Sequence, residues 1–169
     1  MIRRASPRDA DALTGIAFAA KRHWGYREAQ IAAWAGQLTI TPEQLRYRPA
    51  FVAESGGVPV GFSALRGGES GGWELTDLWV LPAFMGNGIG AALFGAARAH
   101  ATARGGVRLS LESDPHAVGF YEEKMARSGI YRDPSSHTIP MRVDLRQRAD
   151  AEPIRRRIDN AWPPGLAAA

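Results

Sequence analysis

The sequence predicts one domain of mixed α/β or α+β class, built around a single central sheet. Two observations carry this prediction. Segments with helical spacing of apolar residues alternate with short runs of β-branched and aromatic residues, and the main elements follow the order β-α-α-β-β-β-α-β-α-β-β. The size agrees, because 169 residues lie within the range of one domain and 45% hydrophobic residues are enough for its core.

Helices dominate the first fifty residues, after a short strand predicted over residues 2–4. The pair Ser6-Pro7 is typical of a helix start, because serine caps free amides and proline suits the first helical position. It opens a predicted helix over residues 7–21, whose apolar side chains fall on one face. A second helix is predicted over 27–38 and a short third over 41–48.

From residue 51 the pattern changes to strands, separated by two helices and several glycine-rich turns. Strands are predicted over 51–54, 60–65, 73–81, 107–111, 130–132 and 139–145, and helices over 88–104 and 115–126. Residues 1–145 thus form the expected domain, and residues 146–169 are expected to be a basic C-terminal tail containing proline and alanine.

The composition excludes several classes of protein. The chain contains no cysteine, which excludes disulfides, a cysteine nucleophile and thiolate metal ligands. No apolar run approaches the roughly 20 residues of a membrane span, and residues 1–7 lack the apolar core of a signal peptide. The formal net charge is +4, but the basic residues are scattered apart from Arg155–Arg157. We therefore expect a cytoplasmic protein that binds neither membranes nor nucleic acid.

The richest local pattern is the glycine-rich turn Leu81–Gly90, which follows a strand and leads into a helix. The first amides of a helix have no internal partners, and the helix dipole favours negative charge there. Glycine also lets the backbone approach a pyrophosphate closely. The glycines alone are equally compatible with a plain connector. The turn has neither the Gly-x-Gly-x-x-Gly spacing of a dinucleotide fold nor the Lys-Ser/Thr pair of a P-loop.

This segment resembles the acetyl-CoA-binding motif of the GNAT superfamily of N-acetyltransferases, which reads Arg/Gln-x-x-Gly-x-Gly/Ala after a strand ending in Val-x-Pro. Val80-Leu81-Pro82 supplies the approach, and Gly88-Ile89-Gly90 supplies the glycine core. Phe120-Tyr121-Glu122 is similar to the family's second motif, and the order of elements over residues 2–145 also matches. The resemblance implies a GNAT-like fold, with a central mixed, mostly antiparallel sheet and helices on both faces.

Two residues depart from the family pattern. Met85 occupies the place of the usual Arg or Gln and offers no donor to a phosphate, so backbone amides must supply the affinity. Asp114 occupies a place where the family often has Asn, and a carboxylate cannot donate as an amide does.

The resemblance implies that acetyl-CoA, as co-substrate, lies where the strands over 73–81 and 107–111 splay apart. Backbone groups of Trp79 and Val80 would pair with the pantetheine arm, and the amides of residues 86–91 would hold the pyrophosphate. The cofactor-binding residues expected on this basis are Leu78, Trp79, Val80, Met85, Gly86, Asn87, Gly88, Ile89, Gly90, Ala91, Asp114 and Phe120.

Tyr121 is the candidate general acid. Transfer of the acetyl group releases CoA as a thiolate, and a phenol near the sulfur can supply the proton. A tyrosine with an unperturbed pKa of about 10 is protonated at neutral pH. The spacing alone favours an ordinary core tyrosine beside Phe120, and only the resemblance favours the acid role.

Glu74 is the candidate general base, because an amine arrives as ammonium and must lose a proton before it attacks. In several GNAT enzymes the base lies six residues before the valine that corresponds to Val80, which is Glu74 here. Asp77 is the competitor, since it lies nearer the cofactor end. Strand alternation predicts Glu74 and Thr76 on one face and Asp77 on the other. Either carboxylate is also compatible with a solvated charge on a strand.

His23, Trp24 and Tyr26 lie in the turn between the first two helices, which roofs the acceptor site in this family. Their aromatic faces could hold a cationic amine, although packing of the turn also accounts for Trp24. Together with Asp77, they are the substrate-binding residues that we expect.

The predicted function is therefore acetyl-CoA-dependent transfer of an acetyl group to a primary amine of a small molecule or peptide. No metal is expected, because His116 and His137 lack the spacing of metal ligands. The alternative is a catalytically silent sensor domain that binds CoA or acyl-CoA without a working acid or base. Many GNAT enzymes are dimers, so the resemblance also allows a homodimer.

Overall fold

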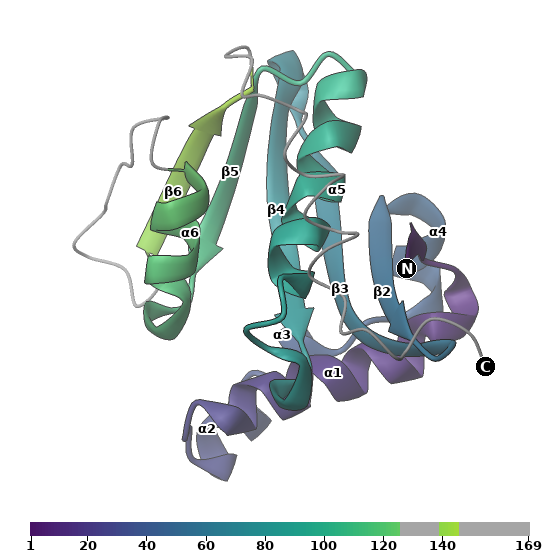
Figure 1. The fold of residues 1–169 in the computed structure, drawn as a ribbon, viewed down its shortest axis with the longest axis vertical. Helices are drawn as coiled ribbons and strands as arrows, with labels where there is room; N and C mark the ends of the chain where they lie inside the picture. Colours follow the sequence, from purple (N-terminus) through teal and green to yellow (C-terminus); the bar gives the residue numbers. More distant parts are fainter. Residues whose placement is uncertain (126–138, 146–169) are drawn as a thin grey trace.

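A computed structural model describes residues 1–125 and 139–145 of the chain (Figure 1). The strands are β1 (Ile2–Arg4), β2 (Ala50–Ser55), β3 (Val58–Gly67), β4 (Gly72–Val80), β5 (Arg108–Ser113) and β6 (Ile139–Asp144). The α-helices are α1 (Ala10–His23), α2 (Glu28–Ala33), α3 (Ala35–Leu38), α4 (Pro42–Tyr47), α5 (Ile89–Ala103) and α6 (Val118–Met125). Short 3-10 turns are η1 (Pro7–Asp9), η2 (Glu69–Gly71), η3 (Pro82–Phe84) and η4 (Pro115–Ala117). The predicted strand over 130–132 and the predicted tail over 146–169 lie outside the described residues.

Within the described residues, six strands form one sheet in the order β1-β2-β3-β4-β5-β6. Among these pairings only that of β4 with β5 is parallel, and the other neighbours are antiparallel. Parallel neighbours need a crossover connection, and α5 provides it (Figure 1). The predicted mixed, mostly antiparallel sheet is confirmed.

Helices cover both faces of this sheet. Phe62 in β3 packs in one core cluster with Leu13 and Ile16 of α1. Its neighbour Ser63 points to the opposite face, where its hydroxyl donates to the carbonyl oxygen of Leu93 in α5 at 3.2 Å. Because successive strand residues alternate between faces, β3 is buried on both sides. The continuous apolar run that marks this strand in the sequence is typical of such burial.

The predicted helix over 27–38 is interrupted at Trp34, which separates α2 from α3. The Trp34 ring packs against the α1 side of the core and meets the Tyr26 ring edge-on, with a centroid distance of 5.0 Å. No helix in the described part of the chain is long and apolar enough to cross a membrane.

The parallel strands β4 and β5 pair for only part of their length. Their register runs from Gly72 opposite Arg108 to Leu75 opposite Leu111, and both strands then continue without pairing to each other. In Figure 1, β5 and β6 diverge from β4 beyond this point. The splay that the family resemblance implied is confirmed. It leaves the β5-facing edge of residues 76–80 without a strand partner among the described residues.

A β-bulge in β4 lies where the two strands begin to part. Ala64 pairs with Asp77 and Leu65 pairs with Leu75, so Thr76 is an extra residue on its strand. A bulge shifts the side-chain alternation by one position and increases the local twist. The predicted faces were therefore wrong, because the bulge brings Asp77 onto the same face as Glu74.

Candidate active site

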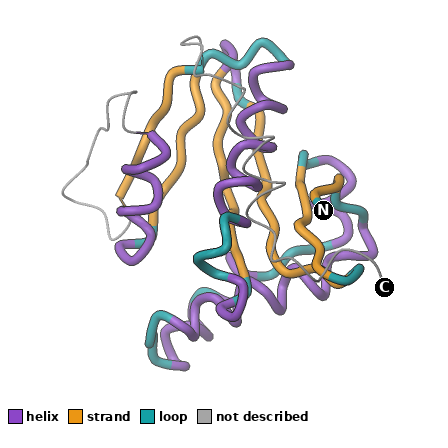
Figure 2. The backbone as a smooth tube through the Cα atoms, viewed as in Figure 1, coloured by secondary structure: helices purple, strands orange, loops and turns teal. Residues whose placement is uncertain are grey.

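The turn that joins β4 to α5 leads directly into the N-terminus of α5 (Figure 2). Helix α5 begins at Ile89, and its N-cap Gly88 has a φ of 78°, a conformation that L side chains rarely adopt. The amides of residues 86–91 donate to no acceptor in the part of the chain that the structure describes. We call residues 86–91 the amide turn. Its donors and the adjacent helix N-terminus are suited to an anion.

Close packing at Gly90 brings α6 against the amide turn. A Cβ atom at Gly90 would lie 3.3 Å from the Phe120 ring, so a larger residue would push the two helices apart. Phe120 and Tyr121 are consecutive in α6, and their rings meet edge-on with a centroid distance of 5.0 Å. This contact places the candidate acid beside the row of donors, although 30 residues separate Gly90 from Phe120 in the sequence.

An open cavity of about 520 Å³ runs along the splay from the amide turn to Tyr121. The residues predicted from the sequence that line it are Trp24, Asp77, Leu78, Trp79, Val80, Met85, Gly86, Gly88, Gly90, Ala91, Asp114, Phe120 and Tyr121. The predicted residues outside its lining are His23, Tyr26, Glu74, Asn87 and Ile89. Free amides at one end and the unpaired edge of β4 along one side fit a pyrophosphate followed by an amide-containing arm.

Tyr121 is buried, and its ring contacts Phe94 and Phe120 edge-on. Burial and the negative charge of Asp77 raise the pKa of the Tyr121 phenol well above its usual value. The hydroxyl donates to no residue that the structure describes, and the side chain lines the cavity. A phenol of this kind is protonated at neutral pH and has its proton available for transfer.

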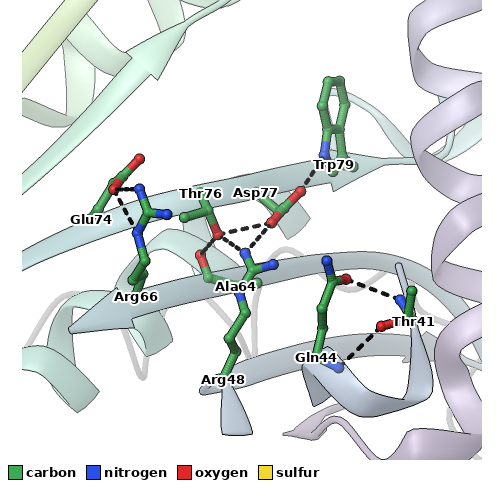
Figure 3. A network of polar contacts seen from close by, with 9 residues as sticks. All are labelled: Thr41, Gln44, Arg48, Ala64, Arg66, Glu74, Thr76, Asp77 and Trp79. Carbon is green, nitrogen blue, oxygen red and sulfur yellow. Dashed lines mark hydrogen bonds and ion pairs between the residues drawn. The ribbon is translucent and has the colours of Figure 1, made fainter. Parts of the chain in front are cut away.

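Asp77 is buried at the centre of a polar network (Figure 3). Its Oδ2 accepts hydrogen bonds from Arg48 Nη2 and Thr76 Oγ1, both at 2.8 Å. The same Arg48 nitrogen also donates to Thr76 Oγ1, whose single hydroxyl proton has two alternative acceptors, Asp77 Oδ2 and the Ala64 carbonyl oxygen at 3.1 Å. Asp77 Oδ1 accepts only a longer bond of 3.3 Å from Trp79 Nε1, among the described residues. One carboxylate oxygen is therefore fixed, and the other can accept a further proton.

Glu74 lies further back along β4, away from the cavity. Its carboxylate accepts two hydrogen bonds from Arg66, at 3.1 Å from Nε and 2.5 Å from Nη2 (Figure 3). It lines a separate groove on the sheet surface. The geometry therefore gives no support to Glu74 as the base and places its competitor Asp77 in the cavity.

Lys21, near the end of α1, is held by a carboxylate and aromatic faces. Its ammonium lies 2.6 Å from Asp114 Oδ2 and over the rings of Tyr26, Trp34 and Trp79, 4.8, 4.6 and 5.6 Å from their centroids. The sequence predicted that aromatic faces of this turn hold a cationic acceptor. The cation that Tyr26 contacts is instead the protein's own lysine.

Asp114 is the centre of a set of contacts that bridge the splay. It accepts hydrogen bonds from Lys21, the Tyr26 hydroxyl and the His116 amide. The Trp24 indole stacks on the His116 imidazole at 5.1 Å, with planes 2° apart. We call Lys21, Trp24, Tyr26, Asp114 and His116 the clasp. It joins the turn after α1 to the end of β5.

The pKa values within the clasp reflect these contacts. Burial would raise the pKa of Asp114, but hydrogen bonds from Lys21 and the His116 amide outweigh it and hold the pKa below its usual range. Burial, then the charge of Asp114, raises the pKa of Tyr26 to about 12. Asp114, which the sequence predicted to bind the cofactor, lines the cavity, but its carboxylate already accepts hydrogen bonds within the clasp.

Sequence reasoning missed Lys21, Arg48 and His116. Their neighbours in the sequence give no signal, because each acts across a sequence separation that only the folded chain closes. The described residues contain no group of three or more candidate metal ligands.

The comparisons with known proteins agree with this geometry. Residues 16–126 match the family described as acetyltransferase (GNAT) family. The PaiA N-acetyltransferase from Thermoplasma acidophilum, solved with coenzyme A, has a TM-score of 0.70 at 19% identity and covers 85% of this chain and 98% of its own. A GNAT family acetyltransferase from Brucella melitensis, solved with acetyl-CoA, has a TM-score of 0.60 at 25% identity, with 83% and 86% covered.

A third similar structure is aminoglycoside 6′-acetyltransferase type Ii, with a TM-score of 0.61 at 22% identity and coverage of 88% of this chain and 99% of its own. No curated protein matches the sequence. The family match spans more than half of the chain, and the solved structures share its fold. The chain therefore belongs to the acetyltransferase (GNAT) family and is an acyltransferase.

Proposed function

We propose that the protein transfers the acetyl group of acetyl-CoA to a primary amine. One observation carries the proposal: the amide turn and the Tyr121 hydroxyl line the same cavity, and neither donates to a residue that the structure describes. The donors suit the pyrophosphate, and the phenol suits the thiolate that leaves when the thioester is cleaved. Solved proteins of this fold carry coenzyme A or acetyl-CoA, which supports the choice of donor.

Acetyl-CoA supplies an activated acyl carbon bound to sulfur. The amine must lose one proton before its nitrogen forms the new bond to that carbon. We assign this proton to Oδ1 of Asp77, since its other oxygen is held by Arg48 and Thr76. As the carbon–sulfur bond breaks, Tyr121 gives its proton to the sulfur, and the nitrogen loses its second proton to solvent. Asp77 then releases its proton to solvent and Tyr121 takes one up, so both side chains return to their starting states. The products are an amide and free CoA thiol.

The amide turn would act without side-chain donors. Met85 lines the cavity and packs with Phe84 against the core beside α5, so it contributes shape rather than charge. The phosphates would then be held by backbone amides and the dipole of α5, and Lys124 lines the same cavity as a nearby cation.

The test is thiol release from acetyl-CoA in the presence of a panel of primary amines. Turnover that requires both amine and Tyr121 supports the proposal. Binding of CoA without turnover by any amine would instead favour a silent sensor domain. Asp77→Asn and Glu74→Gln separate the two carboxylates, because only the loss of Asp77 is expected to remove the base.

We also propose that residues 1–145 are sufficient for this activity. The residues that line the cavity fall between Ala20 and Lys124. A chain ending after Leu145 is therefore expected to retain most of its turnover number. Its kcat, compared with that of the full chain, gives the check.

A further inference from the structure

A second groove, of about 430 Å³, lies on the surface of β4, β5 and β6. The buried residues Leu109, Leu111 and Met141 pack in a core cluster with residues of α5, so the residues that alternate with them point to the opposite face. The strand register places Glu74, Ser110 and Arg142 side by side on that opposite face. The charged residues that line the groove are Glu74, Arg108, Glu112 and Arg142. We call it the arginine groove.

Neither glutamate of the arginine groove is without a partner. Glu74 is already bound to Arg66 through two hydrogen bonds. Arg108 and Arg142 are exposed, and neither makes an ion pair or hydrogen bond with a residue that the structure describes. Asp144 stands opposite Arg108 in the ladder, yet no ion pair joins these two side chains in the described part of the chain. Two guanidinium groups on adjacent strands are suited to a planar anion such as a carboxylate.

The arginine groove adjoins the active-site cavity, because Glu112 lines both. Arg142 stands opposite Ser110, two residues before Glu112, which is roughly 7 Å along the strand. Arg108 lies four residues before Glu112, roughly 13 Å away. A molecule that reaches from either guanidinium to the cavity must therefore span several bonds.

The carboxylates that line the cavity are Asp77, Glu112, Asp114 and Glu123, and each of them has a partner. Asp77 is paired with Arg48. Asp114 is paired with Lys21, whose ammonium already lies among the rings of Tyr26, Trp34 and Trp79, the aromatic cage. The arginines of the second groove are the described groups near the acyl site that are left to recognise a charged part of the acceptor.

From this geometry we infer that the acceptor carries a carboxylate, which binds to Arg142 and Arg108 while its amine enters the cavity. The inference rests on the proposed function and narrows its substrate. It selects compounds in which several bonds separate the amine from the carboxylate, such as ω-amino acids, lysine-type side chains or short peptides.

The experiment compares matched pairs of acceptors, each an acid and its neutral amide, in a series of ω-amino acids and dipeptides. Binding to CoA-loaded protein is measured by calorimetry, and turnover by thiol release. At least one acid is expected to show a KM about tenfold to a hundredfold below that of its amide, as expected for charge-assisted hydrogen bonds. Arg142→Ala is expected to raise the KM of the acid toward that of its amide, and Arg142→Lys to restore part of the preference.

Arg8→Ala is the matched control, since Arg8 is exposed in η1, outside the groove, and its loss removes the same charge. If no acid binds or reacts better than its amide, or if Arg142→Ala weakens acid and amide equally, the inference is overturned. Selective binding of acids without turnover by any acceptor would overturn the proposed function and leave this inference standing. Turnover of acids and amides with equal KM would overturn this inference and leave the proposed function standing.

Discussion

The two ends of the active-site cavity differ in the groups that form them, which are backbone amides at one end and side chains at the other. At one end the amide turn presents backbone N–H groups, and the side chains of Asn87 and Ile89 lie outside the cavity lining. At the other end the clasp relies on side chains that meet across the splay, with Asp114 at their centre. The comparison teaches that the first end tolerates changes of side chain, as Met85 illustrates. The second end depends on the identity of each residue.

Tyr121 lines the same cavity, and its replacement should have the largest effect. Tyr121→Phe removes the proton donor and keeps the ring contacts with Phe94 and Phe120. We expect kcat to fall about 10²- to 10⁴-fold, the usual contribution of general acid catalysis. CoA affinity, measured by calorimetry, should stay within about twofold, because the change adds no atom. An unchanged kcat would remove Tyr121 from the mechanism.

The clasp should be most sensitive at Asp114. Asp114→Ala leaves the Lys21 ammonium inside its aromatic cage without a carboxylate, which is costly for a largely buried cation. We expect a loss of about 2 kcal/mol in the free energy of unfolding, less than for a fully buried pair because both side chains keep some exposure. Lys21→Met should cost less, about 1 kcal/mol, since a thioether fits among aromatic rings. Urea unfolding of both variants measures the difference, and equal losses would argue against the clasp.

The amide turn should respond to backbone changes and not to side-chain removal. Gly88→Ala puts a Cβ on a residue with a φ of 78° and is expected to weaken acetyl-CoA binding about fivefold to tenfold. Asn87→Ala is the matched control and should change affinity by less than about twofold, since Asn87 lies outside the cavity lining. Calorimetric titration with CoA distinguishes the two. A larger effect for Asn87→Ala would contradict a binding site made by the backbone.

The two ends should also differ in their response to pH, the smallest effect that we predict. The folded chain holds the Tyr26 proton more tightly than the unfolded chain, so its stabilising contribution is complete below a pH of about 10. It is lost as pH rises toward the Tyr26 pKa of about 12. The lowered pKa of Asp114 acts in the opposite direction, and its contribution is lost as pH falls below about 4. The amide turn contains no group that titrates.

Unfolding free energies of the natural chain and of Tyr26→Phe, measured between pH 9 and about 11, test this difference. The natural chain should lose stability faster than the variant as the pH rises. Parallel curves would mean that the Tyr26 hydroxyl does not stabilise the folded state.

The fold and the amide turn could be predicted because their signals are local. The apolar run of β3, the glycines of residues 86–91 and the helix that follows lie within short windows of sequence. The family resemblance then supplied the splay of β4 and β5, which the register confirms. The interruption of the helix at Trp34 was not predicted, because the ring packs against Tyr26 in the folded chain.

The side-chain half of the site could not be predicted in the same way. Alternation along an ideal strand placed Glu74 and Asp77 on opposite faces, and the extra residue at Thr76 reversed this. Arg48, which follows α4, reaches Asp77 across 29 residues, and Lys21 reaches Asp114 across 93 residues. No pattern within a single segment contains such contacts.

The sequence by itself determined the class of the fold, the position of the glycine-rich turn before α5 and the choice of Tyr121 as candidate acid. These depend on periodicity, glycine content and a motif, all of which are properties of neighbouring residues. The tertiary structure decided which carboxylate faces the cavity, which cation fills the aromatic cage and where unpaired arginines gather. The physical reason is that charge pairing and burial depend on distances in space, and one bulge changes which side chains come within reach.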